Sequence, residues 1–322
     1  MLTVIYQIAR NTFRECIREP ITLLIIGCGL IMIGVLPLFT NYVFREQVKM
    51  VVDSSLACIL VFGMLIAVLN ASYAVNREIR NGTVLLILSK PVKRPVFILS
   101  KILGIMAVVL VFGILSSIAM LISIRVAKDQ FQFDMTITIM YWVFIVLALV
   151  VGIAANFFKR SSFVEYTVYG LMGLMPLFLL IVRFMPSEGK MVGIPTENIP
   201  ALVLVVMAIL CMACLATALS TILPFVSNLV VCFFIFVLGL MSDYIFGIPA
   251  GRGEWYSSIA AFMHSIIPNW QEFWLADALA LHNHIPGSYL MNAFIYFLSL
   301  VTFFGLLAVF LFQDREIGNQ RL

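Results

Sequence analysis

The stretch Arg77–Gly104 reads REIRNGTVLLILSKPVKRPVFILSKILG, and it interrupts the long apolar runs of this chain with a short basic segment. Gly82 can end a preceding helix in a backbone conformation that residues with a β-carbon resist, and Thr83 can cap a new helix by accepting a backbone N–H. Pro91 ends that helix, because it lacks an N–H and disfavours the α region for the residue before it. The sequence therefore predicts a short helix at 83–90, between two long apolar runs.

Composition places the chain among integral membrane proteins. Its 322 residues are 63% hydrophobic and only 11% charged, and the mean hydropathy is +1.10. So few polar side chains cannot cover the surface of a soluble globule of this length. The lipid bilayer is therefore the expected surroundings, and the small net charge of +4 gives no reason to expect a nucleic-acid partner.

Eight apolar runs are long enough to cross a bilayer, which takes about 20 residues of helix. We expect an all-α, polytopic membrane helical bundle that forms one transmembrane domain over residues 1–322. The predicted spans lie near 21–44, 54–75, 97–124, 137–157, 163–184, 200–222, 226–246 and 288–312.

The first residues, 2–19, predict a helix that lies on the membrane rather than across it. Apolar residues recur there at helical spacing, and Arg10, Arg14 and Arg18 fall between them. This alternation is typical of an amphipathic interfacial helix. Pro20 then turns the chain into the bilayer.

The distribution of basic residues predicts the orientation in the membrane. An even number of spans leaves both termini on one side, and if that side is the cytosol, 13 of the 20 Lys and Arg residues lie inside and 7 outside. This bias obeys the positive-inside rule. We expect both termini and the turn Lys159–Arg160 to be cytosolic, in the bacterial inner (plasma) membrane.

The longest stretch outside the predicted spans precedes the last one, and it contains three of the four Trp residues. Aromatic and aliphatic residues keep helical spacing up to Ile266, and Pro268-Asn269 breaks the run before Trp270 and Trp274. Aromatic rings favour the headgroup level of a bilayer. We expect two short outer interfacial helices over 253–280, which serve as an outer gate, an exit lip for a substrate or a brace for the spans.

The chain shows no catalytic set and no metal site. Phe184 stands where the first Gly of a phosphate-binding loop would precede Gly189-Lys190, so the chain cannot cradle ATP phosphates itself. Glu165 and Asp243 lie near span ends, where burial of a charge costs less than at the bilayer centre. The His residues are all predicted outside, on or near loops: His264, His282 and His284.

The segment around the short helix closely resembles the coupling-helix region of the type-2 ABC exporter permeases. The resemblance rests on Glu78, Gly82-Thr83, a run of aliphatic residues, Ser89, Pro91-Val92, Lys93-Arg94, Lys101 and Gly104. In that family this helix sits in a cleft on a separate ATPase subunit. The resemblance implies an ATPase-coupling role for Glu78, Gly82, Thr83, Val84, Leu85, Leu88, Pro91, Lys93 and Arg94. Leu85 departs from the family pattern, because members often carry an acidic residue there.

The same resemblance implies an elbow helix at 2–19, re-entrant helices before the last span, and a transport function. The chain would be the membrane-spanning subunit of an ATP-driven exporter, paired with a second permease copy or a homologue and with two cytosolic ABC ATPase subunits. ATP and Mg²⁺ would bind to those partners, and this chain would hold no cofactor. Six spans are usual in the family, so the hairpin at 135–197 is interpreted as an addition.

Other functions stay open from the sequence. A membrane anchor that transmits force without moving a substrate would keep the same coupling helix. An ion-coupled secondary transporter would need ionisable groups and broken helices near the bilayer midplane, and an intramembrane enzyme would need a convergent catalytic set. The residues leave open the substrate, the direction of transport, homodimer against heterodimer, and six against eight true spans.

Overall fold

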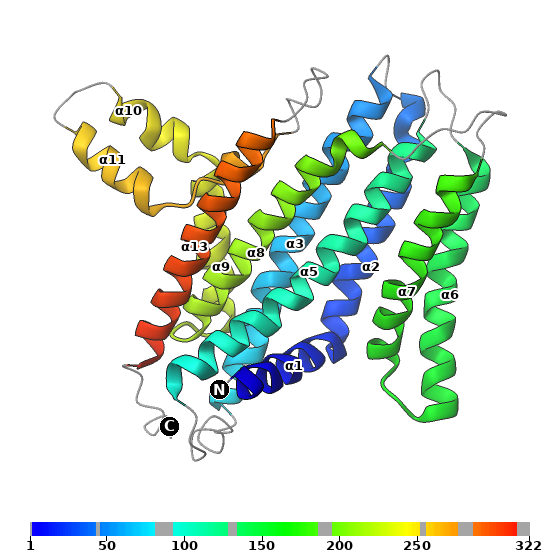
Figure 1. Cartoon of the computed structure of the whole chain (residues 1–322), viewed down its shortest axis with the longest axis horizontal. Helices are drawn as coiled ribbons and strands as arrows, with labels where there is room; N and C mark the ends of the chain where they lie inside the picture. The colour runs from blue at the N-terminus through cyan, green and yellow to red at the C-terminus, as the bar shows by residue number, and fades with distance from the viewer. Residues whose placement is uncertain are drawn as a thin grey trace.

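The computed structural model describes residues 2–42, 46–80, 93–127, 134–185, 195–251, 256–275 and 286–313. Over these ranges the chain is helical and contains no β-strand, so the all-α prediction is confirmed. Long helices run side by side, and α1 (Leu2–Arg18) lies across one end of the bundle, where α13 also ends (Figure 1). We call this the basal end and the other the distal end.

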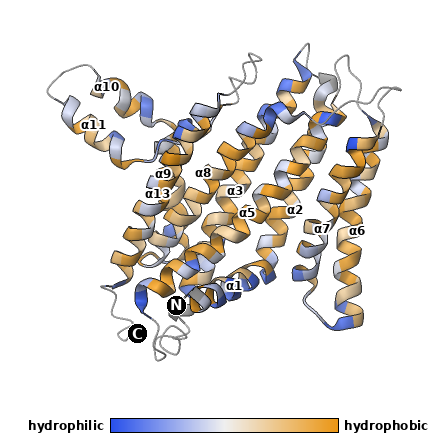
Figure 2. Ribbon diagram, in the orientation of Figure 1, coloured by the Kyte–Doolittle hydropathy of each residue, from blue (hydrophilic) through white to orange (hydrophobic). Residues whose placement is uncertain are grey.

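Seven helices in the described part of the chain are long and apolar enough to cross a membrane. They are α2 (Pro20–Val35, continued by the 3₁₀ turn η1, Leu36–Tyr42), α3 (Gln47–Arg80), α5 (Arg94–Val126), α6 (Met135–Lys159), α7 (Phe163–Phe184), α8 (Ile199–Ser220, preceded by η2, Thr196–Asn198) and α13 (Gly287–Gln313). Most of the length of these helices is orange, the colour of hydrophobic residues, whereas α1 shows both orange and blue (Figure 2).

The span predicted near 226–246 coincides with a bent pair of helices that together are long and apolar enough to cross a membrane. Helix α9 ends at Leu240 (Phe225–Leu240), and the chain bends by 57° into a π-helical turn, η3 (Asp243–Gly247), followed by α10 (Ile248–Ala250). Two later residues account for the bend. Trp270 packs against Gly239, where any Cβ would clash with its ring, and the Gln271 side chain donates to the Leu240 carbonyl over 2.7 Å.

Helices α3, α5 and α8 form the centre of the bundle. Between 61% and 72% of the most apolar window of each is buried, against 28% for α6 and 22% for α13. The buried side chains are mostly Ile, Val, Leu, Ala and Phe. A few polar ones bind across helices: the Asn228 amide donates to Ser72 Oγ over 2.7 Å and to the Ala216 carbonyl over 3.1 Å. Such bonds join α9 to α3 and α8 where no water competes.

Helices α6 and α7 form an antiparallel hairpin at the edge of the bundle (Figure 1). Arg160 ends α6 with a φ of 52°, in the left-handed region. The Tyr141 hydroxyl donates to the Leu30 carbonyl over 2.7 Å, and its ring covers Gly34, where a Cβ would clash with it. The hairpin is thus fixed to α2 through one aromatic side chain.

Of the predicted interfacial region 253–280, the described residues 256–275 contain an α-helix, α11 (Ser257–Ile266), and a 3₁₀ turn, η4 (Trp270–Phe273). Helices α10 and α11 project from the distal end of the bundle (Figure 1). Trp270 and Phe273 are 2% and 1% exposed, in the protein core, and Phe273 stacks on Tyr296 of α13. These two rings therefore anchor η4 to the bundle.

Candidate functional site

Most of the predicted ATPase-coupling residues lie outside the described part of the chain. These are Gly82, Thr83, Val84, Leu85, Leu88 and Pro91, together with the rest of the predicted helix at 83–90 and the side chain of Glu78. Lys93 stands directly before α5, and the Arg94 guanidinium donates to the Gln313 carbonyl at the end of α13 over 2.8 Å. The coupling role of all these residues remains a prediction.

The described residues at the basal end, where α3 ends and α5 begins, include several charged side chains. Glu165 at the start of α7 has a side chain only 4% exposed, and it pairs with two arginines of α1. Arg18 Nε lies 2.7 Å from one carboxylate oxygen, and Arg14 Nη2 lies 3.1 Å from the other. A buried carboxylate needs such partners, because its desolvation is costly. These pairs hold the elbow-like helix α1 against α7.

A second group of charges joins α1 to the last turns of α3. Arg77 lies with Nη1 3.3 Å from Glu19 Oε1 and 3.8 Å from Glu15 Oε1, and the same nitrogen donates to the Tyr73 hydroxyl over 2.7 Å. Arg77 is about half exposed, so each contact is weak by itself. Together with the Glu165 pairs, these contacts make a network that we call the basal clamp: Arg14, Glu15, Arg18, Glu19, Tyr73, Arg77 and Glu165.

Two residues that carry the family resemblance pack the helices inside this clamp. Lys101 of α5 is 1% exposed, and its ammonium group donates to the Ala74 carbonyl of α3 over 3.1 Å. A Cβ on Gly104 would lie 2.6 Å from the Ala9 carbonyl oxygen and 2.7 Å from Thr12 Cβ, both on α1. Only glycine allows this approach of α1 to α5. The chain ends that flank 81–92 therefore leave from helices that are packed tightly together.

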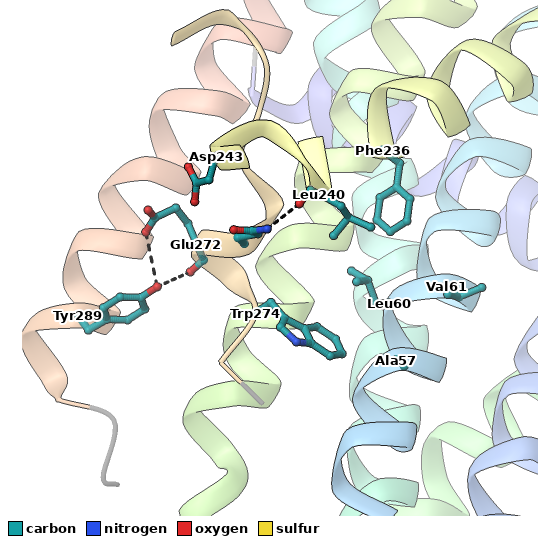
Figure 3. A pocket seen from close by; sticks show the side chains of 10 residues that line it. Ala57, Leu60, Val61, Phe236, Leu240, Asp243, Glu272, Trp274 and Tyr289 are labelled. Atoms are coloured by element: carbon teal, nitrogen blue, oxygen red, sulfur yellow. Dashed lines mark hydrogen bonds between the residues drawn. The ribbon is translucent and has the colours of Figure 1, made fainter. Parts of the chain in front are cut away.

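A pocket of about 670 Å³ lies in the distal half, between α3, α9, η4 and the start of α13 (Figure 3). Its lining residues are Ala57, Leu60, Val61, Phe236, Leu240, Asp243, Gln271, Glu272, Trp274 and Tyr289. The residues of α3 and α9 make an apolar wall, and Trp274 points toward α3 (Figure 3). The polar residues gather on the side of η4 and α13.

Hydrogen bonds fix the polar wall of this pocket. The Tyr289 hydroxyl donates to the Glu272 carbonyl over 2.8 Å and lies 3.5 Å from the Glu272 carboxylate (Figure 3). The Asn269 amide donates to Asp243 Oδ1 over 2.9 Å, and His264 Nε2 lies 3.6 Å from the same oxygen. Asp243 and Glu272 thus both line the cavity, and hydrogen bonds hold the Asp243 carboxylate and the Glu272 backbone in place.

The sequence alone does not predict this pocket. Asp243 stands out there only as an acidic residue near a span end, and Glu272 lies 29 positions away in a stretch dominated by aromatic residues. The break at Pro268-Asn269 is the available signal, because it returns the chain to the bundle. Within the described ranges no group of three His, Cys, Asp or Glu residues could hold a metal ion.

The helices and their hydropathy define an integral membrane protein, and the match to a known family defines its class. The model of the ABC-2 family transporter proteins matches residues 6–199, from α1 through the α6–α7 hairpin and more than half of the chain. The chain belongs to this family and is a membrane permease component of an ABC transporter. The suspected resemblance is thereby confirmed. A search of curated proteins finds no match to it.

Proposed function

We propose that this chain is the membrane-spanning subunit of an ATP-driven exporter, powered by separate ABC ATPase subunits that dock on the helix predicted at 83–90. Two permeases and two ATPases form the working unit. ATP and Mg²⁺ are bound by the ATPases, and their closure moves the spans through the docked helix. Membership of the ABC-2 family supports the partnership with an ATPase.

The basal clamp is the structural observation that carries this proposal. Arg80 ends α3 and Arg94 begins α5. Close to these ends Arg77 ties α3 to α1, Gly104 allows α5 to pack on α1, and Lys101 ties α5 to α3. A displacement of the segment between them therefore moves α1, α3 and α5 together. A partner shifts a conformational equilibrium only through contacts that differ between the two states. Helices that move as one rigid unit can pass such a shift from the docked segment to the spans.

Two substitutions separate binding of the ATPase from transmission of its movement to the spans. Leu85→Asp places an unpaired charge in the proposed interface, so we expect the ATPase to be lost on co-purification. Gly82→Val leaves the apolar face intact but strains the entry turn if Gly82 has a positive φ. We expect that variant to keep the ATPase, with ATP hydrolysis that no longer responds to cargo. Normal co-purification and transport by Leu85→Asp would overturn the assignment of this segment.

A matched control adds the same charge elsewhere on the predicted cytosolic side. Ser161 lies in the turn between α6 and α7, away from α3 and α5. Ser161→Asp should leave both co-purification and transport unchanged. Loss of the ATPase in this variant would indicate a general charge effect instead of a specific interface.

Orientation is tested by labelling single cysteines in intact cells. We infer that both termini and Lys159 face the cytosol of a bacterium, because the Lys and Arg distribution favours that side. An impermeant thiol reagent should therefore miss a cysteine at position 159 and reach one near position 252. The reverse pattern would exclude this orientation.

A further inference from the structure

We propose that the distal pocket binds a hydrophobic cation, with its ammonium group between Asp243 and Glu272 and its apolar body against α3 and α9. This deepens the proposed function, on which its role as a cargo site rests, because it names the class of molecule. Binding itself is a property of this chain alone.

The charges of the residues that line the pocket favour a cation. Asp243 and Glu272 face the cavity, and the described lining residues include no Lys or Arg. The described contacts of Asp243, with Asn269 and His264, all use Oδ1. Two carboxylates in one cavity attract a cation and repel an anion.

The opposite wall of the pocket, formed by α3 and α9, is apolar. Leu60 and Val61 of α3 and Phe236 and Leu240 of α9 offer only hydrocarbon, and Trp274 lies between them and the polar wall (Figure 3). Aromatic faces attract ammonium groups. An inorganic cation would use the carboxylates alone and leave this wall without a partner. An amphipathic cation matches both walls.

The pocket has the size of a small-molecule site, and its polar wall is held in place by the bundle. A volume of about 670 Å³ lies within the range of roughly 300–1,000 Å³ that is typical of small-molecule sites. Trp270 and Phe273 hold η4 in the core, and Gln271 binds the end of α9. The polar wall is therefore preformed, and a ligand need not organise it on binding.

The test uses the purified permease in lipid nanodiscs without any ATPase. The probe is radiolabelled dodecyltrimethylammonium, with empty nanodiscs as the blank and dodecyl sulfate as the anionic comparison. We expect saturable binding of the cation and none of the anion. Asp243→Asn and Glu272→Gln should each weaken binding by about tenfold, the size of a partly screened charge contact, and the double variant should abolish it.

Glu197→Gln is the matched control, since Glu197 is exposed on η2, outside the pocket. It removes one carboxylate charge and should leave the affinity unchanged. Ala57→Phe fills the apolar wall and should shift the preference toward cations with shorter alkyl chains. Equal binding of cation and anion, or unchanged cation binding in the double variant, would overturn the proposal.

Mass spectrometry of the purified permease distinguishes two sources of this chemistry. A choline-headgroup lipid that co-purifies with the wild type and is lost from the double variant would identify the ligand as a bilayer lipid. Binding of the probe without such a lipid would identify a free amphiphile. Cation binding with no ATPase partner in co-purification would overturn the proposed function alone, whereas ATPase coupling without cation binding would overturn this inference alone.

Discussion

The two ends of the bundle use carboxylates in opposite ways. At the basal end, Glu165 is buried and contacts Arg14 and Arg18 within 3.1 Å. At the distal end, Asp243 and Glu272 face a cavity whose described lining has no Lys or Arg. The first arrangement matches a buried charge inside the chain, and the second leaves negative charge to be matched from outside. We therefore expect the basal charges to matter for stability and the distal carboxylates to matter for binding.

The largest effect should follow from removing the cations of the basal end. Arg14→Ala with Arg18→Ala leaves Glu165 buried without an ionic partner, so we expect a loss of about 3 kcal/mol of stability, measured by titration with SDS in lipid micelles. Adding Glu165→Met should recover most of that loss, because the stranded charge is its main cause. Arg10→Ala, on the exposed face of α1, should cost less than about 0.5 kcal/mol. Equal losses in the Arg10 and the double variant would contradict the clamp.

An intermediate effect is expected where α1 meets α5. Gly104→Leu forces the side chain into the Ala9 carbonyl and Thr12, and overpacking of this kind costs about 2 kcal/mol. A Cβ on Gly173 of α7 would have no neighbouring atom within 4 Å, so Gly173→Leu should be close to neutral. The same denaturation assay compares the two variants. A neutral Gly104→Leu would show that the basal end tolerates rearrangement.

The smallest effect on stability is expected at the distal end. Asp243→Asn with Glu272→Gln should change the free energy of unfolding by no more than about 0.5 kcal/mol, because neither carboxylate is matched by a Lys or Arg of the described lining and an amide can keep the hydrogen bonds. The same variant should lose cation binding. A loss of stability as large as that of the Arg14 and Arg18 variant would erase the difference between the two ends.

The sequence was enough to predict the helical membrane class, because apolar runs of about 20 residues have few alternatives to spanning a bilayer. It could not show the bend within 226–246, where most residues are apolar and where Trp270 and Gln271, about 30 positions later, contact the end of α9. Apolar periodicity carries no information on such distant contacts.

The charge contacts at the two ends of the bundle could not be predicted from the sequence, for the same reason. Glu165 lies about 150 positions from Arg14 and Arg18, and only the fold brings them together. Lys101 and Gly104 could be singled out, because they belong to a local pattern that resembles a family. Their packing against Ala74 and α1 could not be derived from that pattern.

The broken helix α9 has a consequence for the lipids around it. Its 16 residues span about 24 Å, which is less than the roughly 30 Å of hydrocarbon in a typical bilayer. The acyl chains beside it must shorten to match, so we expect the membrane to be thinned locally along this side of the protein. A headgroup drawn inward by that mismatch would lie close to the level of the distal pocket. We therefore expect bilayer thickness to influence access to the distal pocket from the side of the membrane.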